Sequence, residues 1–494
     1  MIVRLDGSTD LGRDLLGGKA WSIQRMLAMD IPVPPAFVIP TDACAAYYEA
    51  GRRLPEALVA ELPAAVRWLE EQTGKTFGGG DQLPLLVSVR SGAAQSMPGM
   101  MDTILNLGID DAVQQTLAER VGDAAFAADT RRRYEEQYEA VVGTPSPKAP
   151  AQQLRGAIAA VFDSWQSDRA NSYRRERGIA GEGGTAVTVQ AMVFGNLDDA
   201  SGTGVLFTRD PLTGAPEPLG EWLPRGQGED VVSGRHDPLP LAELEAASPL
   251  LHDELMTAAT RLERDSRDAM DIEFTVESGK LWLLQSRVAK RSPEAAVRLA
   301  VRLVEEGLIE RAEALDRVAP EQAAALLREH LDPVARAQAT PLASGKPACP
   351  GVATGTLVSD SDEAADRAMN GEQIILARAT TDPNDVHAMA VVAGILTELG
   401  GATSHAAVVS RELGVPCVVG CGAGALLPHA GQEATIDAGS GEVFAGRVAV
   451  TKSDEARDPD VHALAQWARE ELGAGEDVAL PELLSRRDRS VATA

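Results

Sequence analysis

A short string toward the C-terminal end of the chain constrains this sequence more than any other feature. It runs from Gly400 to Gly414, reads GGATSHAAVVSRELG, and holds a single histidine, His405. The two leading glycines allow unusual dihedral angles and close backbone approach, and the apolar residues after the histidine have the spacing of a helix with one buried face. Thr403 or Ser404 can cap that helix. We therefore expect His405 near a helix N-terminus, where backbone N–H groups and the helix dipole favour an anion.

Two interpretations of this histidine remain open on the string alone. An imidazole beside an anion-binding helix end is suited to carry a phosphoryl group. A capped helix whose first histidine only packs against its neighbours would have the same local pattern.

Length and charge limit the kind of protein further. A chain of 494 residues is long enough for two to four domains. Its net charge of −27, from 46 basic and 73 acidic residues, disfavours a nucleic-acid or anionic-membrane surface. A nucleotide site remains compatible with this charge, because a few local cations and Mg²⁺ suffice to bind phosphates.

The cysteines and the apolar runs predict a reduced, cytoplasmic protein. The start of the sequence has no signal-peptide pattern, and no apolar run reaches about 18 residues. Cys417 and Cys421 could suggest a metal, but no second ligand pair has suitable spacing. With Cys44 and Cys349, they are better interpreted as buried thiols.

Several pieces of the N-terminal half are suited to phosphate. Gly17 and Gly18 expose backbone N–H groups, and Lys19 adds a point charge, although the spacing is not that of a P-loop. A buried strand over 85–92 contains Arg90. The loop at 96–103, with Gly99, Met100 and Met101, could form a flexible apolar cover. Each piece alone also fits an ordinary turn or a packed loop.

A predicted hairpin brings acidic and polar side chains to one face. Residues 271–276 alternate acidic and apolar positions, so Asp271 and Glu273 share a face of their strand. The strand that follows a short turn carries Gln285 and Arg287. Paired carboxylates on adjacent strands suit Mg²⁺ that carries triphosphate oxygens. An amphipathic hairpin with a solvated acidic face is the alternative.

Together these segments resemble the phosphoenolpyruvate (PEP)-utilising enzymes, and pyruvate phosphate dikinases in particular. The His405 string resembles the phosphohistidine signature of that family. The similarity to its ATP-grasp domain rests on GGK at 17–19, SVRSG at 88–92, SMPGMMDT at 96–103, VQAMV at 189–193, SGTGV at 201–205, QGEDVV at 227–232 and DIEF at 271–274.

This resemblance implies a role for each candidate residue. The matching histidine of the family is phosphorylated and moves between two remote sites, and Thr403 resembles a threonine that regulatory kinases modify, although capping is its simpler interpretation. The implied nucleotide and phosphate ligands are Lys19, Arg90, Gly99, Met100, Met101, Gln190, Met192, Gln285 and Arg287, with a looser match at Arg132 or Arg133. The implied Mg²⁺ ligands are Asp271, Glu273 and Gln285.

The expected fold is α/β and multidomain. An ATP-grasp nucleotide-binding domain at 1–290, with a helical subdomain at about 111–178, precedes a helical linker at 291–340. A swivelling β/β/α phosphohistidine carrier domain follows at 341–447, and a short C-terminal helix and tail occupy 448–494. The proline-containing stretch 339–347 is a candidate hinge for the carrier.

In the dikinase family a large α/β barrel that binds pyruvate or PEP follows the carrier domain. Here the 48 residues from Arg447 to Ala494 are about one-fifth of a typical barrel. We therefore expect a short form in which ATP and inorganic phosphate phosphorylate His405, with Mg²⁺, and a separate barrel subunit passes the phosphoryl to pyruvate. Transfer to another small molecule, or a non-catalytic ATP-binding regulator or carrier, are the alternatives. The sequence does not predict an oligomeric state.

Overall fold

The computed structural model describes residues 1–80, 82–94, 97, 101–176, 183–232, 238–327, 329–452, 455 and 458–491. They form two compact units, each discontinuous in sequence. The N-terminal unit comprises 1–203, 224–227 and 273–286, and the C-terminal unit comprises 204–223, 228–272 and 287–494.

The N-terminal unit is built on an antiparallel sheet of five strands in the order β1-β2-β7-β5-β6. These strands are β1 (Val3–Leu5), β2 (Ala36–Ile39), β5 (Val87–Gly92), β6 (Thr103–Leu107) and β7 (Ala186–Ala191). A small parallel pair, β3 (Thr76–Phe77) and β4 (Pro84–Leu85), lies outside this sheet. Every residue of the central strand β7 is buried, including the polar residues Thr188 and Gln190.

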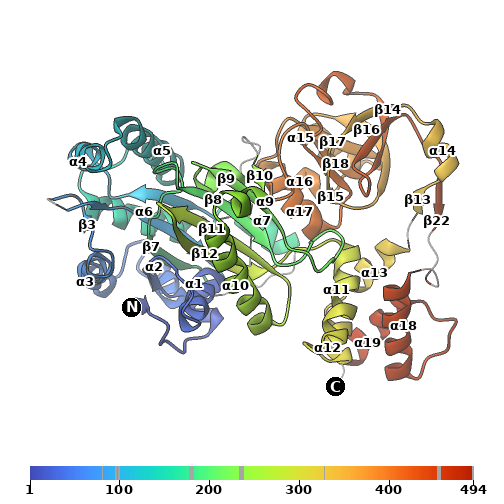
Figure 1. Ribbon diagram of the computed structural model, residues 1–494, viewed down its shortest axis with the longest axis horizontal. Helices are drawn as coiled ribbons and strands as arrows, with labels where there is room; N and C mark the ends of the chain where they lie inside the picture. Colours follow the sequence, from blue (N-terminus) through green and yellow to red (C-terminus); the bar gives the residue numbers. More distant parts are fainter. Residues whose placement is uncertain are drawn as a thin grey trace. The chain divides into compact units, whose positions relative to one another are not determined.

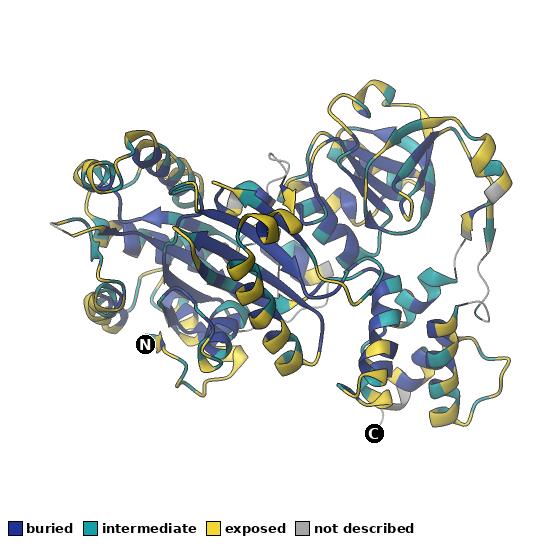
Figure 2. Ribbon diagram, in the orientation of Figure 1, coloured by how far each residue is buried: buried dark blue, intermediate teal, exposed yellow. Residues whose placement is uncertain are grey.

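Seven helices accompany this sheet in the described residues of the N-terminal unit. They are α1 (Arg13–Ala28), α2 (Thr41–Glu49), α3 (Glu56–Thr73), α4 (Asp111–Val121), α5 (Ala124–Val142), α6 (Pro150–Ser164) and α7 (Asp168–Glu176). The predicted helical stretch after Asp111 is confirmed, and the side chains of Asp110 and Asp123 cap α4 and α5. Helices α2 to α6 share one apolar core with strands β2, β5, β6 and β7, and buried residues are dark blue in Figure 2.

A second five-stranded sheet, ordered β10-β9-β8-β11-β12, has residues in both units. Its strands are β8 (Gly202–Phe207), β9 (Leu219–Pro224), β10 (Leu239–Pro240), β11 (Met270–Glu277) and β12 (Lys280–Val288). Between the strands lie α8 (Gly228–Val232), α9 (Ala242–Ala247) and α10 (Pro249–Ser266). The predicted hairpin is confirmed, because β11 and β12 are joined by Ser278 and Gly279, both with positive φ.

A helical bundle in the C-terminal unit joins segments far apart in sequence. It contains α11 (Pro293–Glu305), α12 (Arg311–Asp316), α13 (Pro320–Leu326), α18 (Pro459–Leu472) and α19 (Leu480–Val491), which share one apolar core. Only one C-terminal helix was expected from the sequence, so the polar end predicted after it is wrong. Leu480, Leu483 and Leu484 provide the buried stripe that makes α19 a helix of this bundle.

The carrier part of the C-terminal unit is an eight-stranded sheet in the order β14-β21-β20-β16-β17-β18-β19-β15 (Figure 1). The strands are β14 (Pro341–Ser344), β15 (Lys346–Cys349), β16 (Val352–Val358), β17 (Ile374–Arg378), β18 (Gly394–Thr397), β19 (Cys417–Val419), β20 (Glu433–Asp437) and β21 (Glu442–Ala445). Strands β16 to β19 are parallel, and the outer strands pair antiparallel. Its helices are α15 (Ser361–Met369), η1 (Pro383–Asp385), α16 (Val386–Met389), α17 (His405–Leu413) and η2 (Leu427–His429).

The stretch predicted as a hinge is largely sheet. Residues 341–344 and 346–349 are β14 and β15 at the two edges of the carrier sheet, and the hinge itself stays a prediction. Before them come β13 (Glu329–Leu331), paired with β22 (Val450–Lys452), and the short helix α14 (Pro333–Gln338). Pairing of β14 with β21 and of β15 with β19 satisfies the backbone N–H and C=O groups of this proline-containing segment.

Two further expectations can be compared with the described residues. The four cysteines are unbridged and buried, as predicted. Of the helices in the described part of the chain, none combines the length and the hydropathy that crossing a bilayer requires.

Candidate active site

His405 is the first residue of α17, at the end of the loop that leaves the parallel strand β18. We call residues Gly400–His405 the carrier loop. Ser404 is the helix N-cap with extended backbone, Gly400 has a φ of 112°, and Gly414 ends the helix with a φ of 68°. The helix predicted from the glycines and the apolar spacing is confirmed. The imidazole therefore lies where unpaired helix N–H groups favour an anion.

The hydroxyl groups of the carrier loop do not cap α17. The Ser404 side chain makes no capping bond, and its Oγ has no hydrogen-bond partner among the described residues. The Thr403 hydroxyl instead donates to a carboxylate oxygen of Glu221 on β9, within the C-terminal unit. The predicted capping role of Thr403 is therefore wrong, because a long-range acceptor replaces the local one.

The surroundings of His405 favour a neutral ring. The residue is half-buried, and its Nε2 atom is buried with no hydrogen-bond partner in the described part of the chain. Burial lowers the pKa of His405, while the carboxylates of Asp382 and Asp385 act in the opposite direction. A neutral imidazole whose Nε2 lone pair is unused at neutral pH is a nucleophile.

Asp382 and Asp385 are fixed by their own contacts. They form a capping box around η1, in which the Asp382 backbone N–H donates to Asp385 at 2.9 Å. Asp385 also accepts from the Ser361 hydroxyl and lies 3.5 Å from Nε of Arg378. Negative charge near the ring is thus held in one place, where it can stabilise positive charge that develops on the imidazole.

Arg411, near the end of α17, donates a side-chain hydrogen bond to the backbone of the carrier loop. Its guanidinium is buried and donates to the carbonyls of Ala402 at 3.1 Å and Ala348 at 3.2 Å. The bond to Ala402 fixes the backbone next to Thr403. Because these bonds are charge-assisted and shielded from water, they make the loop a stiff support for His405.

In the N-terminal unit, the predicted phosphate turn packs against the end of β5. Gly17 has a φ of 72°, and a Cβ added to it would lie 1.9 Å from the carbonyl oxygen of Gly92. The Gly18 N–H donates to Ala93 at 2.9 Å, and Nζ of Lys19 donates to the Ser91 carbonyl at 3.0 Å. Gly17 is needed for this close approach, which brings Lys19 to the strand that carries Arg90.

Arg90, Glu273 and Gln285 come together in the same unit. The Arg90 guanidinium lies 3.5 Å from the Glu273 carboxylate, and the Gln285 amide lies 3.5 Å from its other oxygen. Nε of Arg90 and Oε1 of Gln285 are buried without a hydrogen-bond partner in the described residues. Buried polar atoms of this kind are rare, and they are expected where a ligand completes the bonding.

Two of the predicted hairpin ligands, Asp271 and Arg287, lie in the C-terminal unit. Asp271 is only 2% exposed, and Nε of Arg287 donates to it at 2.7 Å. Carboxylate and amide oxygens are the donors that Mg²⁺ prefers, so these residue types fit that ion. Among the described residues, no group of three or more His, Cys, Asp or Glu side chains is arranged to hold a metal. The Mg²⁺ assignment to Asp271, Glu273 and Gln285 stays a prediction.

The other predicted ligands that the structure describes have contacts of their own. The Gln190 amide is buried and donates to the Pro34 carbonyl at 3.1 Å. The half-exposed Arg132 is paired with Asp129 and Glu136 along α5, where Arg133 also contacts Asp129. Met192 packs at the margin of the core and Met101 is half-buried, whereas Gly99 and Met100 lie outside the described residues.

Comparison with known proteins agrees with both halves of this arrangement. Residues 50–242 match the family described as the AMP/ATP-binding domain of pyruvate phosphate dikinase, and residues 370–441 match the mobile domain of PEP-utilising enzymes. The chain is a pyruvate phosphate dikinase-like protein. It combines an ATP-grasp-type domain with a mobile phosphohistidine domain in a mixed α/β architecture.

Curated relatives share this similarity over most of the chain. The dikinase-like chain is 41% identical to the pyruvate, phosphate dikinase of Rhizobium meliloti over 94% of its own length and 59% of that protein. The dikinase of Clostridium symbiosum is also 41% identical, over 83% of this chain and 52% of its own length. Pyruvate, phosphate dikinase 2 of Zea mays is 43% identical, over 83% of this chain and 51% of its own length. The chain thus spans about half the length of these relatives.

Glu221, Arg411, Asp382 and Asp385 are contacts of the carrier loop or of His405 that the sequence analysis missed. Of these, Glu221 gave a weak signal, because it is a lone acid in the otherwise apolar strand β9. Arg411 lies on the buried face of α17, where a charged residue is unexpected. Neither pattern identifies a partner, since the partners lie far away in sequence.

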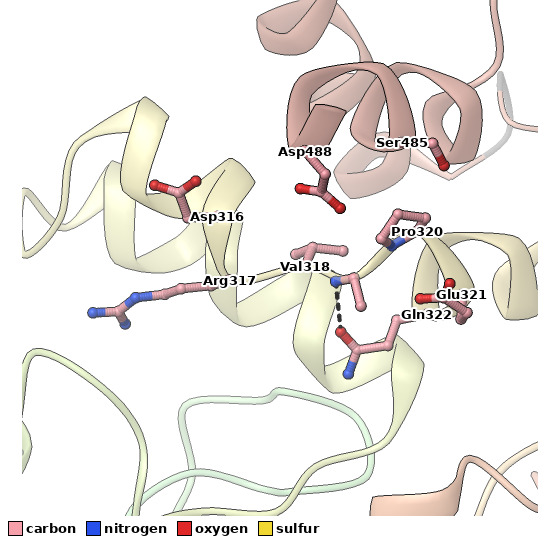
Figure 3. A pocket seen from close by; sticks show the side chains of 9 residues that line it. Asp316, Arg317, Val318, Pro320, Glu321, Gln322, Ser485 and Asp488 are labelled. Atoms are coloured by element: carbon pink, nitrogen blue, oxygen red, sulfur yellow. Dashed lines mark hydrogen bonds between the residues drawn. The ribbon is translucent and has the colours of Figure 1, made fainter. Parts of the chain in front are cut away.

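A cavity of about 460 Å³ lies in the helical bundle of the dikinase-like chain (Figure 3). Residues 316–322, Ser485 and Asp488 line it. The Gln322 side chain accepts from the Ala319 N–H at 3.0 Å, which caps α13. None of the predicted site residues lines this cavity, so it is separate from the candidate active site.

Proposed function

We propose that this chain is an ATP-dependent phosphotransferase of the dikinase type, with His405 as the phosphoryl carrier. The observation that carries the proposal is the buried Nε2 of His405 at the start of α17, which has no hydrogen-bond partner in the described residues, in a chain whose other domain matches an AMP/ATP-binding family. A histidine that only packs would be expected to have both ring nitrogens satisfied or exposed.

The proposed reaction has two steps at this end of the chain. Nε2 of His405 attacks the β-phosphorus of ATP, the bond from that phosphorus to the oxygen bridging the α-phosphate breaks, and AMP leaves. An oxygen of inorganic phosphate then attacks the γ-phosphorus, and the β–γ bridge breaks to release pyrophosphate. Phosphohistidine remains, and its phosphoryl is available for an acceptor.

The protein contributes charge and position. Asp382 and Asp385 stabilise positive charge on the imidazole as Nε2 forms its new bond. In the proposal Lys19, Arg90 and Arg287 neutralise the phosphates, while Gln190 and Met192 contact the adenine. Asp271, Glu273 and Gln285 would hold Mg²⁺, which when bound neutralises phosphate charge.

Pyruvate is the acceptor we propose, with PEP as the product. Support comes from the relatives, which are named for pyruvate and phosphate and share about 41% identity with this chain. The acceptor site would be a PEP- and pyruvate-binding barrel supplied from outside the 494 residues of this sequence. The mobile domain would carry the phosphoryl between the two sites.

Labelling tests the first half of the proposal. The chain is incubated with Mg²⁺, phosphate and ATP labelled at the β-phosphorus, and acid-labile, base-stable label on the protein is measured. Wild type should be labelled, and His405→Asn should not, although it should still bind ATP by calorimetry. Equal labelling of both proteins, or no label in a wild type that binds ATP, would overturn the proposal.

Turnover tests the acceptor. Added pyruvate should discharge the labelled protein only when a PEP-type barrel protein is present, with PEP and AMP formed in equal amounts. Discharge by pyruvate without any barrel would contradict a separate acceptor site.

A further inference from the structure

Arg169, on α7 in the N-terminal unit, holds Asp102, the residue directly before β6. Nη2 of Arg169 donates to the Asp102 carboxylate at 3.0 Å, and both side chains are partly buried. The Asp102 backbone N–H donates to the hydroxyl of Ser164, the last residue of α6, at 3.5 Å. A charge-assisted hydrogen bond is stronger than one between neutral groups, and more so when it is partly shielded from water. The start of β6 is therefore held to the corner between α6 and α7.

The corner between α6 and α7 is itself stiff. The Arg174 guanidinium, only 4% exposed, donates to the Trp165 carbonyl at 2.8 Å and lies 4.0 Å from the centroid of the Trp165 ring. It also donates to the Asn171 side chain at 2.5 Å. A buried guanidinium with two acceptors and an aromatic ring fixes the end of α6 relative to α7. Helix α7 thus presents Arg169 to Asp102 from a fixed place.

From Asp102, a chain of contacts leads to the predicted phosphate turn. The Asp102 carbonyl accepts from the Ser91 N–H at 3.4 Å, next to Arg90 on β5. The Ser91 carbonyl in turn accepts from Nζ of Lys19 at 3.0 Å. Arg90 and Thr103 are direct partners across the β5–β6 ladder. A shift of Asp102 would therefore displace both the strand that carries Arg90 and the carbonyl that anchors Lys19.

Arg169 supports this ladder from the face opposite to the Arg90 side chain. Because Arg90 and Thr103 are ladder partners, their side chains share one face, and alternation along the strand places Asp102 on the other. The Arg90 guanidinium lies 3.5 Å from Glu273 on its own face. Nε of Arg169 is buried without a hydrogen-bond partner in the described residues. A guanidinium with an unbonded buried donor stabilises a fold less than a fully bonded one, so its contacts support placement of Asp102 as its main role.

We propose that Arg169 is a positioning residue of the nucleotide site, which acts through Asp102 to hold Lys19 and Arg90 where they neutralise the phosphates of ATP. This inference rests on the proposed function for the identity of the ligand. ATP carries two more phosphates than AMP, so it depends more on these two cations. Loss of Arg169 should therefore weaken ATP binding more than AMP binding.

Matched variants test the contact. Arg169→Met removes the donor at similar length, and Asp102→Ala removes the acceptor. Arg169→Lys keeps a charged donor, which suffices because only one nitrogen and one oxygen form the bond. Arg175→Met is the control, because Arg175 lies on the same helix, is exposed and in the described residues bonds only Ser172.

Calorimetry with Mg²⁺ compares the Kd values of ATP and AMP in these variants. The ATP Kd should rise about 5- to 30-fold in Arg169→Met and in Asp102→Ala, with a change of less than about twofold in the AMP Kd. Arg169→Lys should return the ATP Kd to within about threefold of wild type, and Arg175→Met should leave both values within about twofold.

A double variant separates positioning from general damage. Arg169→Met combined with Asp102→Ala should bind ATP little more weakly than either single variant, because both remove one contact. Damage to the whole domain would instead raise the Kd of ATP and AMP alike. Multiplying effects in the double variant, equal loss of affinity for the two nucleotides, or wild-type ATP affinity in Arg169→Met would overturn the inference.

Hydrogen exchange tests the contact independently of nucleotide. Without ATP, a peptide that covers β5 should exchange at least about fivefold faster in Arg169→Met than in wild type or Arg175→Met, because the acceptor of the Ser91 N–H is no longer fixed. A wild type that shows this difference but binds neither ATP nor AMP would overturn the proposed function and keep the contact. Unchanged exchange would overturn the inference, whatever calorimetry shows.

Discussion

Substitution of Gly17 by alanine tests whether the turn before Lys19 is built as described. Gly17 has φ 72° and ψ 161°, a region that residues other than glycine essentially never occupy, at a cost of about 1–3 kcal/mol. The new Cβ would also lie 1.9 Å from the carbonyl oxygen of Gly92, which is backbone and cannot rotate away. Relief of such overlap typically costs about 1–3 kcal/mol. The two terms together predict a loss of about 2–6 kcal/mol in the free energy of unfolding.

The matched control is Gly12→Ala in the same segment. Gly12 has a φ of −68°, and an added Cβ there meets no atom within 4 Å. As the N-cap of α1 it should cost less than about 1 kcal/mol when changed to alanine. Urea unfolding followed by circular dichroism and fluorescence compares the two variants, and calorimetry measures ATP binding. Gly17→Ala should be less stable than Gly12→Ala and should bind ATP more weakly, because Lys19 moves with the turn. Equal stability of the two variants would refute the close packing of Gly17 against β5.

Three further predictions concern the site and the thiols. Burial lowers the pKa of His405 below the ordinary value of about 6.5. The rate of His405 labelling should therefore stay constant as the pH falls to that value and decline only below it, so a rate that already declines above pH 7 would contradict this. Because the folded chain binds fewer protons at His405 than the unfolded chain, its stability relative to His405→Asn should also fall as the pH is lowered. Arg90→Met leaves Glu273 without its 3.5 Å partner and removes a proposed phosphate ligand, so ATP affinity by calorimetry should fall at least about tenfold. Affinity equal to that of the surface variant Arg311→Met, at an exposed arginine paired with Glu470, would exclude such a role. Burial raises the pKa of Cys349, Cys417 and Cys421 to about 12 and that of Cys44 to about 11. A thiol reagent at pH 8 should therefore react with none of the four until urea unfolds the chain. Rapid reaction of the folded protein would show that the thiols are accessible.

Local patterns predicted much of the backbone correctly. The alternation in 271–276 and the turn after it predicted the β11–β12 hairpin, and the glycines and apolar spacing predicted the helix that begins at His405. These features depend on period and on residues with special dihedral angles, which neighbours in sequence determine. For the stretch 339–347 the sequence predicted a hinge but not its strands, because β14 and β15 form by pairing with strands distant in sequence.

For the candidate site, too, sequence identified residue types, whereas the structure identified their contacts. Gly17, Gly18 and Lys19 were found from sequence, and the structure adds that contact with β5 requires a glycine at position 17. Arg132 looked equivalent to Arg133 and to other basic residues on α5, and only its ion pairs place it on a half-exposed face. A side chain's partners depend on elements brought together by folding, so residue type alone could not assign them.

By itself, the sequence determined the family string around His405, the helix that begins there and the chemistry its residue types allow. The tertiary structure alone decided that the Thr403 hydroxyl bonds Glu221 instead of capping α17, that burial lowers the pKa of His405, and that its Nε2 has no hydrogen-bond partner among the described residues. The physical reason is distance along the chain. Glu221 and Thr403 are 182 residues apart, so their contact exists only after β9 and the carrier loop have been packed together.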